Sequence, residues 1–271
     1  MGLDKYALDY PNAQNSTPEH GSKPMIKALF LDMDETLCDT HGADETAKQR
    51  LASDLTALIG KHFDSSSFAN EYVQGIYRQW SEKQRLRYLP VAEQESEGAF
   101  RRLLVHDLLA KQGQIGHGDS FAQNILDKFD QHRMDAFDFY PGITDFLLNA
   151  RKVFKLVVIT NGPEHSQIPK TEKIKLADYV DHIIIGGQEP EQKPAVSIFE
   201  KALALVDCQP HEAIHVGDNL AADIAGANDS GITSVWIQHQ QALDAELGIN
   251  PDHTIIRPDE IPAIIRHIHP H

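Results

Sequence analysis

The sequence is poor in cysteine and has no long apolar segment, and each shortage excludes a class of protein. Only two cysteines, Cys38 and Cys208, occur in 271 residues, which is too few for a disulfide framework and shows no zinc-binding spacing. We therefore expect a reducing, cytoplasmic location. No apolar run approaches the ~18 to 20 residues that cross a bilayer, and the amino terminus lacks the basic-then-apolar order of a secretory signal. We expect no membrane partner.

Positive charge is also scarce. Lys and Arg total 25 against 40 Asp and Glu, a net charge of −15, so the surface is not built to neutralise nucleic-acid phosphates or anionic lipid. The composition therefore excludes binding to a nucleic acid polymer. At roughly 100 to 200 residues per domain, the length accommodates one large domain or a core with an insertion.

Alternating strand and helix patterns predict an α/β fold outside the middle of the chain. Residues 1–24 are polar and punctuated by proline and glycine, and this composition predicts a flexible arm. Parallel strands joined by right-handed crossover helices form a Rossmann-like, doubly wound parallel sheet. Expected strands cover 27–31, 155–160, 182–185, 213–216 and 233–237, and expected helices cover about 166–176, 195–206 and 220–228.

The middle of the chain is helical in pattern, without convincing strands. Four apolar stripes at helical spacing predict a four-helix bundle. The bundle, residues 40–134, interrupts a discontinuous core made of residues 25–39 and 135–271. The stripes are Leu51/Leu55/Leu58/Ile59, Phe68/Tyr72/Ile76/Trp80, Phe100/Leu103/Leu104/Leu108 and Phe121/Ile125/Phe129.

Two carboxylates follow the first predicted strand. Asp32 and Asp34 are two residues apart, so an extended chain points both to one side. Adjacent anions repel, and a hard divalent cation such as Mg²⁺ relieves that repulsion with the oxygen ligands it prefers. Taken alone, the pair is equally well explained as a strand cap.

The other strand ends carry complementary groups. Thr160 and Asn161 end a strand in a turn that suits a phosphate oxygen, Lys193 precedes a helix, and Asp218 follows a strand and a glycine, with Asp223 five residues on. Each has an ordinary alternative: a capping hydroxyl, a solvated lysine, or, for Asp223, a helix-dipole partner. Because open α/β sheets gather such strand ends in one place, the set together predicts a site for Mg²⁺ and a phosphoryl group.

The ordered motifs D-M-D-E-T (32–36), Thr160, Lys193 and G-D-x-x-x-x-D (217–223) resemble the four motifs of the haloacid dehalogenase (HAD) superfamily of phosphohydrolases, in its helical-cap form. Within it, segments 39–43, 160–162 and 186–199 are most similar to the N-acylneuraminate-9-phosphatases. Pyrimidine 5′-nucleotidases share D-x-D-E-T. The substrate therefore stays open between a sugar phosphate and a nucleotide.

The resemblance implies a phosphatase that acts on a small phosphorylated metabolite. It makes Asp32 the nucleophile that forms an aspartyl-phosphate and Asp34 the general acid and base. It makes Thr160, Asn161 and Lys193 the residues that hold the phosphoryl oxygens.

The resemblance also implies Mg²⁺ as the cofactor. Its ligands would be Asp32, the backbone carbonyl of Asp34 and Asp218, with Asn219 and Asp223 supporting them from behind. Mg²⁺ and a lysine together stabilise the charge that spreads over a transferring phosphoryl group.

Three alternatives use the same residues differently. A phosphomutase forms the same aspartyl-phosphate, and a haloacid dehalogenase does not use a second aspartate as Asp34 is placed to act. A non-catalytic protein would retain a degenerate site for binding a ligand or a partner. Basic side chains of the bundle are candidates to meet an anionic substrate, but helix surfaces normally carry such residues. They are Arg78, Lys83, Arg85, Arg87, Arg101 and Arg102.

Overall fold

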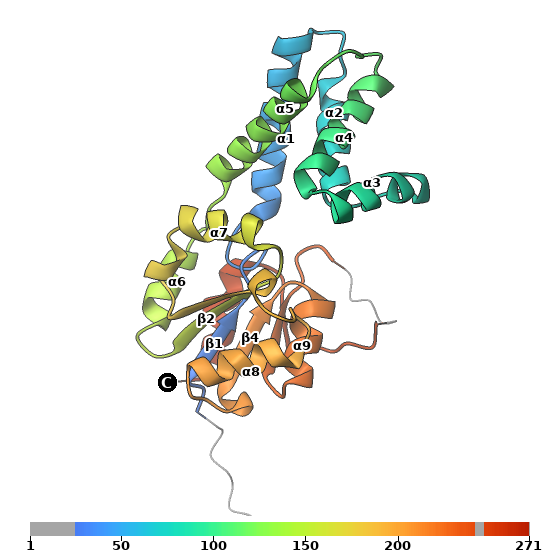
Figure 1. Cartoon of the computed structure of the whole chain (residues 1–271). Helices are drawn as coiled ribbons and strands as arrows, with labels where there is room; N and C mark the ends of the chain where they lie inside the picture. The colour runs from blue at the N-terminus through green and yellow to red at the C-terminus, as the bar shows by residue number, and fades with distance from the viewer. Residues whose placement is uncertain (1–24, 242–246, 271) are drawn as a thin grey trace, which may run out of the picture.

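The computed structural model describes residues 25–241 and 247–270, so the expected flexible arm, residues 1–24, lies outside the described residues. Within them the chain forms a six-stranded sheet in the order β3-β2-β1-β4-β5-β6 (Figure 1), and all paired strands are parallel. The α/β class and the parallel sheet are therefore confirmed. The strands are β1 (Ala28–Leu31), β2 (Lys155–Thr160), β3 (His182–Ile185), β4 (Ala213–Gly217), β5 (Thr233–Ile237) and β6 (His253–Ile255).

Helices cover both faces of the sheet because its central strand is apolar on both sides. Leu29 and Leu31 of β1 belong to one buried cluster, with residues of α6 and α10, whereas Ala28 and Phe30 belong to another, with residues of α8. This alternation is what a doubly wound sheet requires. The helices outside the insertion are α6 (Ile143–Ala150), α7 (Glu164–Lys173), α8 (Val196–Leu205), α9 (Ala225–Asp229) and α10 (Ile261–Ile268).

The first strand lies in the middle of the sheet, between β2 and β4. Leu31, its last residue, pairs with Val158 on one side and Val216 on the other, and the next backbone N–H, of Asp32, donates to the Val216 carbonyl at 2.9 Å. Asp32 is therefore held between the carboxyl ends of two neighbouring strands, where open parallel sheets form their binding crevices.

The helical insertion between β1 and β2 has its own core. Its buried aromatic and aliphatic side chains, among them Tyr72, Phe100 and Phe129, form a cluster separate from those of the sheet. Figure 1 shows these helices extending away from the sheet beyond one edge of it. They are α1 (Thr40–Ile59), α2 (Ser65–Ile76), α3 (Glu82–Gln94), α4 (Glu97–Lys111) and α5 (Asp119–Ala136).

The expected number of four helices is wrong, because the fully described segment 40–136 contains five. The four apolar stripes correspond to α1, α2, α4 and α5. The additional helix, α3, buries only Tyr88 among its residues and contains Pro90, so it has no apolar stripe that a helical period would reveal. A capping box formed by Ser81 and Gln84 starts it instead.

Three elements of the core were also not predicted: α6, β6 and α10. The expected helix 220–228 begins as a short π-helix, Leu220–Ile224, and continues as α9. The expected strands 155–160, 182–185 and 233–237 have the observed bounds. The remaining short helices, of 3₁₀ type, are Leu176–Asp178, Gly186–Gln188, Pro210–Glu212 and Pro258–Glu260. No helix within 25–241 and 247–270 is long and apolar enough to cross a membrane.

Candidate active site

A cavity of about 230 Å³ lies at the carboxyl ends of β1, β2 and β4, and every site residue expected from the sequence lines it. A larger cavity, of about 360 Å³, lies between α6 and α10, and its lining is mostly apolar, with none of these site residues. The smaller, polar cavity is therefore the candidate active site. It is lined by Asp32, Asp34, Glu35, Thr160, Asn161, Lys193, Asp218, Asn219, Ala222 and Asp223.

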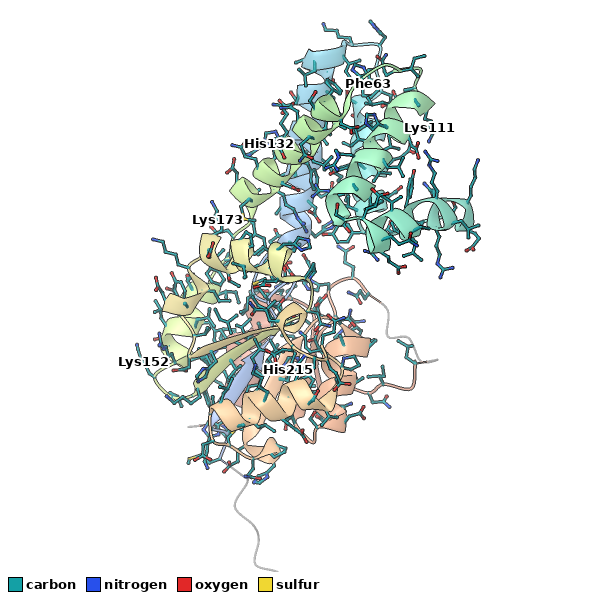
Figure 2. The ribbon with its side chains drawn as sticks, viewed as in Figure 1. Phe63, Lys111, His132, Lys152, Lys173 and His215 are labelled. Atoms are coloured by element: carbon teal, nitrogen blue, oxygen red, sulfur yellow. The ribbon has the colours of Figure 1, made fainter. Side chains whose placement is uncertain are left out.

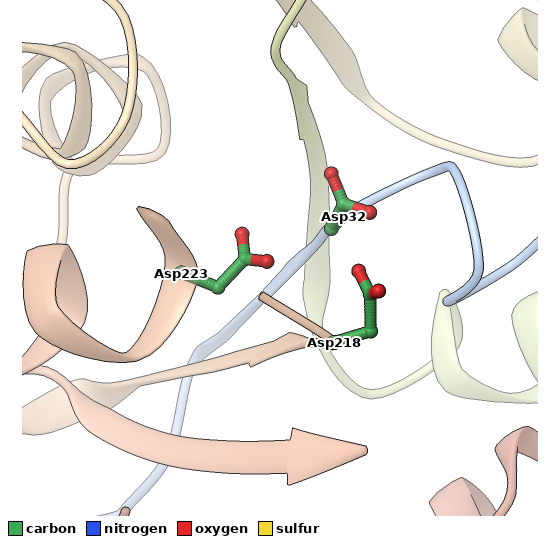
Figure 3. Close-up of side chains that lie close together, drawn as sticks. All are labelled: Asp32, Asp218 and Asp223. Atoms are coloured by element: carbon green, nitrogen blue, oxygen red, sulfur yellow. The ribbon is translucent and has the colours of Figure 1, made fainter. Parts of the chain in front are cut away.

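Three carboxylates converge in this cavity. One oxygen from each of Asp32, Asp218 and Asp223 lies within 4.8 Å of the others, and Figure 3 shows the three side chains lying close together. Asp32 follows β1, and Asp218 follows β4. Parallel pairing of these two strands brings together residues that are almost 190 positions apart in the sequence.

Lys193 lies inside this cluster and not on the surface. Its Nζ donates to Asp32 Oδ1 at 2.6 Å and to Asp223 Oδ1 at 2.6 Å, and its side chain is only 2% exposed. The neighbouring carboxylates hold the pKa of Lys193 above its ordinary value although burial lowers it. The ammonium is therefore a fixed positive charge beside the Asp32 carboxylate.

Asp223 is fully engaged by the protein. Its Oδ1 also contacts His215 Nε2 at 3.0 Å, and its Oδ2 accepts from the Asn219 backbone N–H at 3.0 Å. His215 is completely buried on β4, within the core in Figure 2. Because both oxygens of the Asp223 carboxylate are bonded to groups of the protein, Asp223 is suited to orient the Lys193 ammonium.

The charges in the cavity fit a divalent cation. Burial raises the pKa of Asp32 to about 7, opposed by Lys193 and reinforced by the other carboxylates. Burial raises the pKa of Asp218 to about 8, and Asp32 and Asp223 add to the rise. The negative charge at this point thus exceeds what Lys193 balances. A hard cation with oxygen ligands supplies the missing positive charge.

Asn161 connects the end of β2 to the loop that carries Lys193. Its side-chain amide donates to the Lys193 carbonyl at 2.8 Å, and its amide oxygen accepts from the Lys193 backbone N–H at 3.0 Å. The Asn161 side chain therefore positions Lys193, and a role of Asn161 in holding a phosphate oxygen stays a prediction.

Asp34 also lines the cavity but is not one of the three converging carboxylates. Lys170 Nζ donates to both of its oxygens, at 2.8 and 3.0 Å, Gln167 Nε2 donates at 2.8 Å, and Thr40 Oγ1 donates at 2.5 Å. Burial favours a higher pKa for Asp34, but Lys170, Gln167 and Thr40 together bring the pKa below its ordinary value. Asp34 is therefore held ionised.

The sequence did not identify Gln167, Lys170 or Thr40 as site residues. Gln167 and Lys170 are both nearly buried, three residues apart on α7, so they lie on one face of that helix. Polar residues on such a helix usually face water, and α7 is rich in them. Only the position of α7 beside the strand ends shows that this face points to Asp34.

Replacing Lys170 by methionine is expected to lower the free energy of unfolding by about 1 to 3 kcal/mol at pH 7, because a part-buried carboxylate loses a charged donor. Since the folded-state pKa of Asp34 is depressed, the pair stabilises the protein above pH ~4, the ordinary value of Asp, and the difference from wild type shrinks as the pH falls below it. Urea unfolding from pH 7 to pH 3 measures this. Lys173→Met, on an exposed face of α7, is the control, and a difference that does not depend on pH would contradict the assignment.

Comparison with known proteins agrees with this geometry. Residues 26–231 match the model of the haloacid dehalogenase-like hydrolase family, and the chain belongs to that family. It is 27% identical over 258 residues to the N-acylneuraminate-9-phosphatase of Mus musculus, covering 90% of this chain and 95% of the relative. It is 30% identical over 224 residues to the glyceraldehyde 3-phosphate phosphatase of Pyrococcus furiosus, covering 82% and 85%.

A solved structure shares the fold. The magnesium-bound HAD-hydrolase structure of YfnB from Bacillus subtilis superposes with a TM-score of 0.64 at 20% identity, covering 91% of this chain and 100% of that chain. The similarity extends over the helical insertion as well as the sheet.

Proposed function

We propose that this hydrolase is a Mg²⁺-dependent phosphatase that cleaves a small sugar phosphate through an aspartyl-phosphate on Asp32. The observation that carries the proposal is the buried Asp32 carboxylate, bonded to Lys193 Nζ at 2.6 Å and converging with Asp218 and Asp223. The relatives named for N-acylneuraminate 9-phosphate and glyceraldehyde 3-phosphate support a sugar phosphate over a nucleotide.

In the first half-reaction an Asp32 oxygen attacks phosphorus, and the bond from phosphorus to the ester oxygen breaks. Asp34 gives a proton to the departing alkoxide; since its contacts in the free site favour the ionised form, it takes up this proton as the substrate binds. Lys193 and Thr160, both almost fully buried, bind the phosphoryl oxygens and stabilise the charge that spreads over them. The product is an alcohol, and the phosphoryl group stays on Asp32.

In the second half-reaction water attacks the phosphorus of the aspartyl-phosphate, and Asp34 accepts the proton of that water. Phosphate leaves, and the Asp32 carboxylate is regenerated. The contacts of Asp34 with Lys170 and Gln167 favour its ionised form, which is the form that this step requires.

Asp32, Asp218 and the backbone carbonyl of Asp34 would hold Mg²⁺, with Asn219 and Asp223 supporting these ligands. When bound, the cation supplies positive charge to the phosphoryl oxygens and balances the carboxylates. The donors fit, because the converging side chains are all carboxylates and two of them have a raised pKa.

We propose that residues 40–134 act as a cap over this site. Thr40, the first residue of α1, contacts Asp34 directly, so the insertion begins at the reacting groups. Motion of such a cap would admit the substrate and then exclude water. We also propose a cytoplasmic enzyme, since both cysteines are buried and unpaired as in reduced proteins.

Removing divalent metal is expected to abolish phosphate release from p-nitrophenyl phosphate, because uncompensated carboxylates repel the anionic substrate. The enzyme is treated with EDTA, dialysed and assayed for phosphate, and added Mg²⁺ is expected to restore the rate. Full activity after EDTA would contradict the metal assignment.

A panel of phosphorylated metabolites identifies the substrate class. It includes N-acylneuraminate 9-phosphate, glyceraldehyde 3-phosphate and the pyrimidine monophosphates, with phosphate, isomerised product and halide measured separately. Preference for sugar phosphates supports the proposal. Isomerisation without phosphate release would show a phosphomutase, and halide release from a haloacid would show a dehalogenase.

A further inference from the structure

A cluster of polar side chains lies at the base of the insertion, one helical turn along α1 from Thr40, which bonds Asp34. Arg133 Nε of α5 lies 2.6 Å from Asp44 Oδ1 of α1, and Arg133 Nη2 donates to the Tyr77 hydroxyl at 2.7 Å. That hydroxyl donates to Asp44 Oδ2. Three helices, α1, α2 and α5, therefore meet at these three residues.

Two separate paths along the chain place this cluster next to the candidate active site. Thr40, which bonds Asp34, and Asp44 are four residues apart on α1, so they share one face about one 5.4 Å turn apart. Phe137 lies under Lys170, the partner of Asp34, with Nζ 5.5 Å from the ring centroid. Arg133 is four residues before Phe137, and the Phe137 N–H donates to the Arg133 carbonyl.

Electrostatics agrees with this placement. Burial raises the pKa of the Tyr77 hydroxyl, Arg133 lowers it, and Asp44 and the nearby Asp34 carboxylate raise it further. Since Asp34 is the group proposed to meet the ester oxygen, the placement of the cluster near Asp34 makes it a candidate to contact the leaving group.

The exposed part of the cluster offers an aromatic face and a neutralised guanidinium. Tyr77 is 47% exposed, although its hydroxyl is bonded on both sides, and the Arg133 side chain is 20% exposed. Asp44 is 5% exposed, so it holds Arg133 from behind and cancels its charge. Such a surface suits a neutral group whose hydroxyls form hydrogen bonds and whose C–H bonds pack on the aromatic ring. A second anionic group on the substrate would not be attracted, because Asp44 neutralises the charge of Arg133.

We propose that Tyr77 and Arg133 form a leaving-group subsite for a polyhydroxylated, uncharged carbon chain, with Asp44 as the residue that positions Arg133. The inference rests on the proposed phosphatase function and specifies its substrate class. In a nucleotide the group beside the ester oxygen is a ribose, so the base would lie beyond the part of the leaving group that this subsite contacts.

Five of the six basic residues considered in the sequence are paired elsewhere on the insertion. Arg87 pairs with Asp107, Arg101 with Tyr72 and Asp130, Arg78 with Glu97, Arg102 with Gln123 and Arg85 with Glu82. Arg133 was not among those candidates, because only the meeting of α1, α2 and α5 distinguishes it from other surface arginines.

The test compares two esters of equal chain length, a hexitol 6-phosphate and n-hexyl phosphate. The ratio of their kcat/KM values measures recognition of the hydroxyls, and it cancels any loss in the phosphoryl-transfer step itself. We expect wild type to favour the hexitol ester and Arg133→Met to reduce the ratio by about 10- to 100-fold, as for the loss of hydrogen bonds to a charged group. Arg87→Met, the same change in an ion pair elsewhere on the insertion, is the control and is expected to keep the wild-type ratio.

Two further variants keep the test decisive if Arg133→Met does not fold. Tyr77→Leu is expected to reduce the same ratio by about 10-fold by removing the ring. Asp44→Asn leaves the Arg133 charge uncompensated, so the preference for 3-phosphoglycerate over glycerol 3-phosphate is expected to rise by about 5- to 10-fold.

Unchanged ratios in all folded variants would overturn the subsite, as would a loss confined to nucleotide substrates. These outcomes are distinct from failure of the proposed function, in which wild type itself releases no phosphate from any ester. That failure would overturn the subsite as well.

Discussion

Replacing Asp32 by asparagine is expected to lower phosphate release from every ester by at least about 10³-fold, because the amide cannot act as the nucleophile. Single-turnover assays with ³²P-labelled substrate measure both halves of the reaction. Wild type is expected to carry acid-stable label on the protein after a quench, and Asp32→Asn is expected to carry none.

The same variant distinguishes lost chemistry from lost folding. Because burial raises the pKa of Asp32 to about 7, keeping it ionised in the folded protein at pH 8 costs folding free energy, and a neutral side chain of the same shape removes that cost. Asp32→Asn should therefore melt no lower than wild type in metal-free buffer at pH 8. Asp229→Asn, at an exposed position, is the matched control and is expected to keep full activity. Retained activity in Asp32→Asn would exclude Asp32 as the nucleophile.

Replacing Lys193 by methionine is expected to lower the free energy of unfolding by about 3 to 5 kcal/mol in metal-free buffer, the usual cost of removing one partner from a buried ion pair. The reason is geometric: Lys193 is bonded to both Asp32 and Asp223, and its loss leaves two buried carboxylates without their ammonium. Urea denaturation measures the change. Activity is also expected to fall, because the phosphoryl oxygens lose a fixed positive charge.

Magnesium provides a second measurement on this variant. If a divalent cation binds the carboxylates, Mg²⁺ should stabilise Lys193→Met, since binding to the folded state alone raises its stability. Lys201→Met is the control, with an expected change of no more than about 1 kcal/mol, because the Lys201 side chain is 46% exposed and pairs with Glu189. A similar small change for Lys193→Met would show that the buried cluster does not depend on its lysine.

Several elements were predictable from the sequence because their signals are local. The β-rich runs at 155–160, 182–185 and 233–237 have the observed strand bounds, since strands buried on both faces are continuously apolar. The four apolar stripes of the insertion correspond to four of its helices for a similar reason. Helix α3 escaped prediction because its sequence is polar, and it buries only Tyr88.

Only the site residues that belong to recognisable motifs could be predicted from the sequence. Asp32, Thr160, Lys193 and Asp218 occur near strand ends or before a helix, and a parallel sheet brings strand ends together. Their partners Gln167, Lys170 and His215 carry no such signal, because a polar residue in a helix or strand has no feature that shows which neighbour it faces.

The sequence by itself determined the class of fold, the order of the strands along the chain, and the chemical types of group that meet at their ends, because periodicity and motif spacing are properties of short segments. Only the tertiary structure decided that Lys193 lies between Asp32 and Asp223, that Lys170 holds Asp34, and that Asp44, Tyr77 and Arg133 meet beside it. These contacts join residues 30 to 161 positions apart. Their distances depend on how whole helices pack against the sheet and against one another, which no local pattern encodes.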